Sequence, residues 1–223
     1  TVIANEQSAG RGRLVRSFHS PKDTGIYFSV LLRPTCKPAE IVQITTWTAV
    51  AIAKAVERAT GVRPAIKWVN DLLVGDRKIC GILTEMSVES ETGTIQYVVA
   101  GIGVNVNPEI SDFPEELCGI AGSIAMAVGH PVQRARLAAC MIEEMDNLRK
   151  AWPSGREDYL KAYREMCIST GREVLVTDAR HTGEFAKHGF CEAVNDDFSL
   201  RIRYDDGSYE NVSSGEVSVK PQK

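Results

Sequence analysis

RPAIKWVNDLLVGDRKICGILTEMSVESETGTIQYVVAGIGVN, residues 63–105, alternates apolar and β-branched runs with short turn signals. Gly75-Asp76 is typical of a tight hairpin turn between two strands, and Glu91 to Thr94 marks the next turn. Strands joined by such short turns pair antiparallel. The predicted strands are 63–68, 72–74, 78–88 and 95–105. This stretch therefore predicts an antiparallel sheet at the centre of the chain.

The flanking segments add one strand and several helices. Gly25 to Arg33 is rich in aromatic and branched residues and predicts a strand. Pro38 and Glu40 suit the first turn of a helix, and Gly61 suits its end. Further helices are predicted at 124–129, 134–152 and 156–167. The fold class is therefore α+β, a mixed or antiparallel sheet with helices on one side.

The pattern changes near Ser169, where short alternating strands begin. Asp206-Gly207 is a strong hairpin signal within them. The predicted strands are 173–177, 183–194, 199–204 and 208–212. We expect two domains, 1–169 and 170–223, the second a compact β-barrel. Thr1 to Ala4 resembles a strand already under way, so we expect the natural chain to begin earlier.

Composition narrows the class of protein. The formal net charge is −3, so there is no global basic field for nucleic acid or an anionic membrane. No apolar run approaches the ~20 residues that span a bilayer, and no signal peptide is apparent. The six cysteines have neither zinc-site nor disulfide spacing, which favours free thiols in a reducing cytoplasm.

Three motifs contain residues suited to chemistry, and each also has a purely structural interpretation. Gly10-Arg11-Gly12-Arg13, followed by Arg16, can bring backbone amides and planar guanidinium groups to an anion, or be a solvated basic loop. Lys67 to Asp71 places an ammonium beside an amide and a carboxylate, or is an ordinary Asx turn. Gly101 to Asn107 allows close approach of a ligand, or simply ends a strand.

Taken together and in order, the motifs resemble the signatures of biotin protein ligases, and the resemblance covers essentially the whole chain. They are EQSAGRGR (6–13), KWVNDLL (67–73), KICGILTE (78–85), GIGVNVN (101–107) and SGEVS (214–218). The resemblance implies a class II synthetase-like catalytic domain followed by an SH3-like barrel. It also implies a cytoplasmic enzyme that forms biotinyl-5'-AMP from biotin and ATP, with Mg²⁺, and passes biotin to a lysine of a biotin carboxyl carrier protein.

Residue roles follow by position within these motifs. The residues expected to contact biotin are Gln7, Gly10, Arg11, Gly12, Arg13, Lys67 and Gly81. Those expected to contact ATP are Arg13, Arg16, Phe18, Lys67, Asn70 and Asn105, with Phe18 stacking on adenine and Asn105 reading it. Arg13, Lys67 and Asp71 are the expected catalytic residues, Asp71 as a base for the acceptor amine. No residue is assigned as a metal ligand.

The chain departs from the family pattern at several places. Val69 stands where the family usually has proline, Val15 where it has glycine, and Phe18 where it has tryptophan. The smaller Phe18 ring keeps a stacking face, whereas Val15 removes backbone freedom from the closing loop. The family's Ser/Thr-rich biotin segment and any helix-turn-helix domain are absent from this sequence.

Three rival functions remain open from the sequence. They are a lipoate or octanoate ligase, a degenerate non-catalytic domain that binds biotin, and a nucleic-acid-binding barrel. The last needs clustered basic and aromatic residues, but Lys187, His188 and Arg201 are sparse and aspartates oppose them. A homodimer through the sheet that carries Gly101 to Val106 is also open.

Overall fold

The computed structural model describes residues 1–13, 16–35, 37, 40–177, 186–213 and 216–219. Its larger sheet has six strands, all paired antiparallel, in the order β1-β2-β6-β5-β4-β3. The strands are β1 (Val2–Ala4), β2 (Gly25–Leu32), β3 (Ala65–Lys67), β4 (Asp71–Val74), β5 (Arg77–Val88) and β6 (Ile95–Asn105). The predicted antiparallel centre is confirmed, and Gly75, with φ of 58°, forms the β4–β5 turn.

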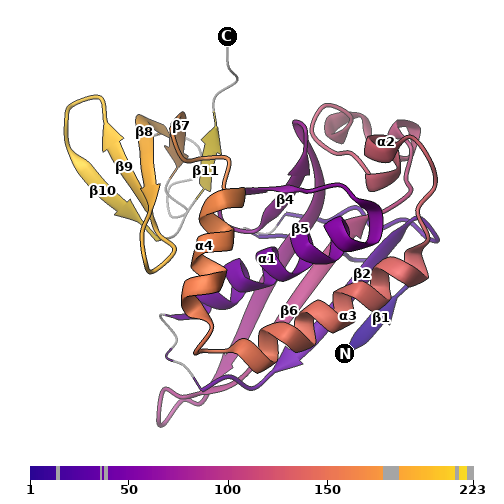
Figure 1. Ribbon diagram of the computed structural model, residues 1–223, viewed down its shortest axis with the longest axis horizontal. Coiled ribbons are helices and arrows are strands. Elements are labelled where there is room, and N and C mark those ends of the chain that lie inside the picture. The colour runs from indigo at the N-terminus through magenta and orange to yellow at the C-terminus, as the bar shows by residue number, and fades with distance from the viewer. Residues whose placement is uncertain (14–15, 36, 38–39, 178–185, 214–215, 220–223) are drawn as a thin grey trace.

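Helices cover one face of this sheet, as Figure 1 shows for α1 and α3. The helices are α1 (Ile41–Thr60), α2 (Ile124–Val128), α3 (Arg134–Ala151) and α4 (Arg156–Met166), and two 3-10 turns cover Ile110–Asp112 and Glu115–Leu117. Gly61 ends α1 in a left-handed conformation, as expected, while Pro38 lies outside the described residues. The α+β class is therefore confirmed, with antiparallel pairing.

Strand alternation decides which face of the sheet is free for a ligand. In β6, Val98, Ala100, Ile102 and Val104 are buried against the helical layer, while the residues between them are only partly buried. Successive side chains point to opposite faces, so 99, 101 and 103 lie on the face away from the helices. The strand order places β6 between β2 and β5, inside the sheet, and leaves β1 and β3 as its edge strands.

The C-terminal segment forms a second antiparallel sheet in the order β10-β9-β8-β7-β11. Its strands are β7 (Arg172–Thr177), β8 (Ala186–Val194), β9 (Leu200–Tyr204), β10 (Tyr209–Val212) and β11 (Glu216–Val219). Gly207, with φ of 82°, forms the predicted hairpin turn. The described pairings leave β10 and β11 at the two edges, so the expected barrel remains a prediction.

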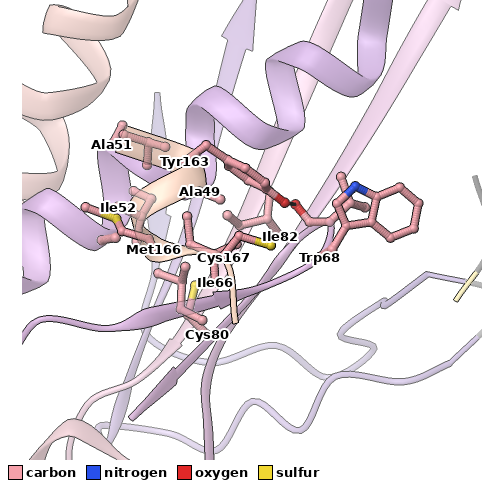
Figure 2. Packing of buried hydrophobic residues seen from close by; sticks show 14 of the residues in the cluster. Ala49, Ala51, Ile52, Ile66, Trp68, Cys80, Ile82, Tyr163, Met166 and Cys167 are labelled. Carbon is pink, nitrogen blue, oxygen red and sulfur yellow. Dashed lines mark hydrogen bonds between the residues drawn. The ribbon is translucent and has the colours of Figure 1, made fainter. Parts of the chain in front are cut away.

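One hydrophobic core runs through both sheets. The cluster joins Ile82 and Ile102 of the large sheet to Tyr163 of α4 and to Phe198 and Val217 of the C-terminal segment. Figure 2 shows Tyr163 pointing toward the chain that carries Trp68. The small sheet is therefore packed onto the large one through α4 and the turn after β3.

Two other sequence predictions, on free cysteines and on membrane-spanning helices, can be compared with the described residues. Cys80, Cys118, Cys140, Cys167 and Cys191 are all free, as predicted, and the first and the last two of these are buried. No helix within the described ranges has the length and apolarity to cross a membrane.

Candidate functional site

A cavity of about 730 Å³ lies against the sheet face that the helices leave free. Small-molecule sites commonly enclose ~300–1,000 Å³. Ten of the predicted site residues line it: Gln7, Arg11, Gly12, Arg13, Arg16, Phe18, Lys67, Asn70, Asp71 and Gly81. The three sequence motifs therefore meet in one place, although they lie far apart in the chain.

The glycine-arginine loop folds back on itself over this cavity. Gly12 donates its backbone N–H to Arg16 O at 2.6 Å, and Phe18 donates to Gly10 O at 2.9 Å. Arg11 Nη2 lies 2.7 Å from Glu85 Oε2 on β5, an exposed ion pair that ties the loop to the sheet. A Cβ at Gly10 would lie 2.3 Å from Phe18 O, so the fold-back requires glycine there.

Asn70 links the loop to the turn between β3 and β4. Arg13 Nη1 donates to Asn70 Oδ1 at 3.1 Å, while Asn70 Nδ2 donates to Ile82 O at 2.8 Å. The Ile82 N–H in turn donates to Asn70 O at 3.0 Å. The guanidinium group of Arg13 is thus held beside the turn that begins with Lys67, and both side chains line the same cavity.

Asp71 has a partner that the sequence did not indicate. Lys78 Nζ lies 2.8 Å from Asp71 Oδ2 across the β4–β5 hairpin, and Lys78 also lines the cavity. Asp71 Oδ1 is buried and has no hydrogen-bond partner among the described residues. That oxygen has acceptor capacity left, but because it is buried a ligand reaches it only after a neighbouring group moves. Spacing could not have identified Lys78, because the pairing depends on a register shift between Leu72 and Leu73.

Two glycines opposite each other form the floor of the cavity. Gly81 of β5 pairs with Gly103 of β6, and the Phe18 ring lies over both. A Cβ at Gly103 would lie 2.4 Å from Phe18 Cε1, and one at Gly81 would lie 3.2 Å from Phe18 Cε2. The absence of side chains at this pair is what allows an aromatic ring to rest on the sheet.

The charge of the lining differs from that of the whole chain. The chain carries a formal charge of −3. Five cationic and two acidic side chains line the cavity, a local net charge of +3: Arg11, Arg13, Arg16, Lys67 and Lys78 against Asp71 and Glu85. Clefts lined by one sign of charge concentrate oppositely charged ligands. The cavity is therefore suited to a ligand that carries several negative charges.

Two predicted site residues, Gly10 and Asn105, and the neighbouring Cys80 do not line the cavity. Gly10 lies outside the lining and packs against the backbone of Phe18, where its lack of a side chain allows the loop to fold back. Asn105 is buried and donates Nδ2 to Gly122 O at 3.1 Å, so its expected contact with adenine remains a prediction. Burial raises the pKa of the Cys80 thiol above its ordinary value, which keeps it protonated and unsuited to nucleophilic attack.

Known proteins share both the sequence and the fold. A sequence model of the biotin/lipoate A/B protein ligase family matches residues 1–105. The bifunctional ligase/repressor BirA of Bacillus subtilis is 42% identical over 134 residues, 60% of this chain and 41% of that protein. The biotin–[acetyl-CoA-carboxylase] ligase of Paracoccus denitrificans is 30% identical over 211 residues, 91% of this chain and 83% of that protein.

The chain belongs to the biotin protein ligase family. A solved biotin protein ligase of Aquifex aeolicus, in complex with biotin and ATP, superposes with a TM-score of 0.80 and 25% identity. That match covers 99% of this chain and 88% of the other. The chain spans only about two fifths of the length of the Bacillus relative that it matches.

Proposed function

We propose that the chain joins biotin to a protein lysine in two steps, through biotinyl-5'-AMP. The observation that carries this is the convergence of Arg13 and Lys67 on one cationic cavity, in a chain of the biotin protein ligase family. A nucleotide triphosphate and a carboxylate are both anionic, and fixed cations favour bringing them together. The relatives and the ATP-bound structure name biotin rather than lipoate, which favours biotin as the substrate.

In the first step a carboxylate oxygen of biotin attacks the α-phosphorus of ATP, and pyrophosphate leaves. Negative charge accumulates on the phosphate oxygens, and Lys67, Arg13 and Arg16 supply positive charge there. The Phe18 ring offers its face to adenine, and Arg11 with Gln7 closes the loop over biotin. The Arg13–Asn70 hydrogen bond keeps the loop in register with the turn that carries Lys67.

Mg²⁺ is expected with the nucleotide. The carboxylate of Asp71 lies in the lining, and Mg²⁺ commonly takes one carboxylate and completes its shell with phosphates and water. Its Oδ1 has no described partner but is buried, so binding the ion there would require a small movement of the side chain. Asp71 would hold the ion, which would neutralise phosphate charge. Lys78, which binds the other carboxylate oxygen, would orient Asp71 in either role.

In the second step the neutral amine of an acceptor lysine attacks the acyl carbon of the anhydride. The carbon–nitrogen bond forms, AMP leaves with the anhydride oxygen, and the amine loses a proton. Asp71, which lines the cavity, is the carboxylate that we propose receives this proton. The proposed acceptor is a biotin carboxyl carrier protein, as the name of the Paracoccus relative suggests.

The finer architecture is also a proposal. We propose a catalytic unit of residues 1–169 and an SH3-like barrel of residues 170–223, supported by the separate second sheet. Free and buried thiols support action in the cytoplasm. A homodimer that pairs the large sheet edge to edge would use β1 or β3, since β6, which carries Gly101 to Asn105, lies inside that sheet.

Isotope exchange between pyrophosphate and ATP tests the first step directly. We expect exchange that depends on biotin and is not supported by lipoate or octanoate. Exchange with lipoate alone would indicate the lipoate-ligase alternative. Binding of biotin without any exchange would indicate the degenerate, non-catalytic alternative. Transfer is then measured as biotin on a purified carrier domain, with the acceptor lysine replaced by arginine as the control.

A further inference from the structure

Trp68 lies in the turn between Lys67 and Asn70 and reaches out of the catalytic sheet. Its side chain is nearly fully buried, and Nε1 donates to the backbone carbonyl of Phe198 at 2.9 Å. Phe198 belongs to the turn between β8 and β9 of the small sheet. Figure 2 shows the indole extending away from Ile66 and Cys80. This hydrogen bond therefore joins the small sheet to the turn that carries the catalytic lysine.

Phe198 has an unusual backbone conformation. Its φ is 65°, in the left-handed region that glycine normally fills at this position of a three-residue hairpin loop. Asn195 N–H donates to Ser199 O at 2.8 Å and Phe198 N–H donates to Asn195 O at 3.0 Å, which closes the turn. A bulky residue keeps such a conformation only when its surroundings fix it. Here the ring is fully buried and packs edge-on against Tyr163, with centroids 5.6 Å apart.

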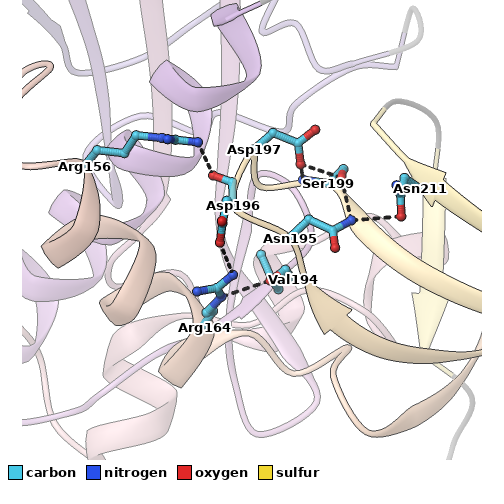
Figure 3. A network of polar contacts seen from close by, with 8 residues as sticks. All are labelled: Arg156, Arg164, Val194, Asn195, Asp196, Asp197, Ser199 and Asn211. Atoms are coloured by element: carbon cyan, nitrogen blue, oxygen red, sulfur yellow. Dashed lines mark hydrogen bonds and ion pairs between the residues drawn. The ribbon is translucent and has the colours of Figure 1, made fainter.

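Helix α4 holds both turns at once. Arg164 donates Nε to Val194 O at 2.9 Å and Nη2 to Asp196 Oδ1 at 2.8 Å. Arg156 Nη2 donates to Asp196 O at 2.5 Å. Figure 3 shows these two arginines reaching from the helix to the turn of the small sheet. On the same helix, Tyr163 Oη lies 3.4 Å from Val69 O, in the turn after Lys67.

We propose that Trp68 and Phe198 are positioning residues, through which the small sheet and α4 set the geometry of the Lys67–Asn70 turn for adenylate formation. The inference deepens the proposed function and rests on it. Lys67 and Asn70 flank the Trp68–Val69 pair, so a shift of the Trp68 backbone would move both. Misplacing a catalytic group by 1 Å can cost roughly 100-fold in rate.

The first two variants weaken the connection between the Trp68 turn and the β8–β9 turn, one at Trp68 and one at α4. Trp68 also lines the cavity, so Trp68→Phe is chosen because it keeps an aromatic ring in the wall and removes the N–H donor. Arg164→Gln acts at a distance, because it removes two of the three described hydrogen bonds from α4 to the β8–β9 turn, and Arg164 does not line the cavity. For each we expect kcat of biotin-dependent exchange to fall roughly 10- to 100-fold, while KM for ATP and biotin changes little. Arg149→Gln is the matched control, since Arg149 is exposed and pairs with Asp146 within α3; it should leave kcat unchanged.

A double-mutant cycle decides whether the effect passes through the indole. If Trp68→Phe has already cut the link, adding Arg164→Gln should lower kcat no further. Indole N–H signals in ¹⁵N-tryptophan-labelled protein give an independent readout. Among the described residues, Trp68 has an acceptor whereas Trp47 Nε1 and Trp152 Nε1 have none. Arg164→Gln should shift the Trp68 signal and leave the other two in place.

The outcomes separate the two proposals. Wild-type protein without exchange would defeat the proposed function itself. Wild-type exchange with kcat preserved in folded Trp68→Phe and Arg164→Gln would overturn the positioning role alone. Additive losses in the double variant, or an unmoved Trp68 signal in Arg164→Gln, would also overturn it.

Discussion

Replacing Gly103 by alanine tests whether the glycine floor sets the position of the Phe18 ring. The added Cβ would lie 2.4 Å from Phe18 Cε1 and 2.6 Å from Cζ. Unbonded carbons rest about 3.5–4.0 Å apart, so the ring must move by about 1 Å or more. The ring lies at the end of a side chain on a loop, so it can yield by rotating, at a cost of about 1 kcal/mol.

The expected result is a loss of function without a loss of fold. We expect the free energy of unfolding to change by about 1 kcal/mol or less, because the ring gives way. We expect kcat/KM for ATP in adenylate formation to fall roughly 10- to 100-fold, because the stacking face is displaced by about 1 Å. Urea unfolding gives the first quantity, and exchange rates over a range of ATP at saturating biotin give the second.

Two comparisons make this prediction refutable. Gly101 lies two residues away on the same strand face, and its Cβ would lie 3.4 Å from Leu83 O, so Gly101→Ala should cost much less. In a Phe18→Ala background the clash is gone, and Gly103→Ala should then add no further loss. An equal loss from both glycines, or the same loss with and without the Phe18 ring, would refute the reasoning.

Three more predictions concern single side chains. Lys67→Ala should abolish detectable biotinyl-adenylate, with unchanged far-ultraviolet circular dichroism; normal turnover in that folded variant would exclude the role of Lys67. Arg13→Gly loses the bond to Asn70 and should release adenylate early, so that bystander proteins become biotinylated on a streptavidin blot; tight retention of the intermediate would contradict this. At pH 8, iodoacetamide should alkylate partly exposed Cys118 but not Cys80, whose pKa burial raises; peptide mass mapping of native protein, with urea-unfolded protein as the control, checks it.

The elements of the fold could be predicted because their signals are local. Gly75 and Gly207 mark hairpin turns by conformations that glycine adopts readily, and both turns are where the sequence places them. The meeting of the Gly10–Arg13 loop with Lys67 could be inferred only from the family resemblance. Nothing in residue spacing places two segments more than fifty residues apart on one cavity.

The missed contacts depend on register and on packing between distant segments. The Lys78–Asp71 pair needs the register shift in the β4–β5 hairpin, which the composition of the strands does not specify. The seat of Phe18 needs two glycines to face each other across β5 and β6. The sequence around Phe198 indicates only a turn. Its ring contact with Tyr163 and the hydrogen bond that its carbonyl accepts from Trp68 depend on the packing of distant segments.

The common interior of the two sheets has a consequence for how such a chain can be cut or recombined. Val217, close to the end of the chain, lines the same cavity as Gln7 near its beginning. A recombination that replaced only the C-terminal segment would therefore change the lining of this cavity. Viable chimaeras should therefore exchange α4 and the Trp68 turn together with that segment. Limited proteolysis of the native protein should not separate the C-terminal segment from α4.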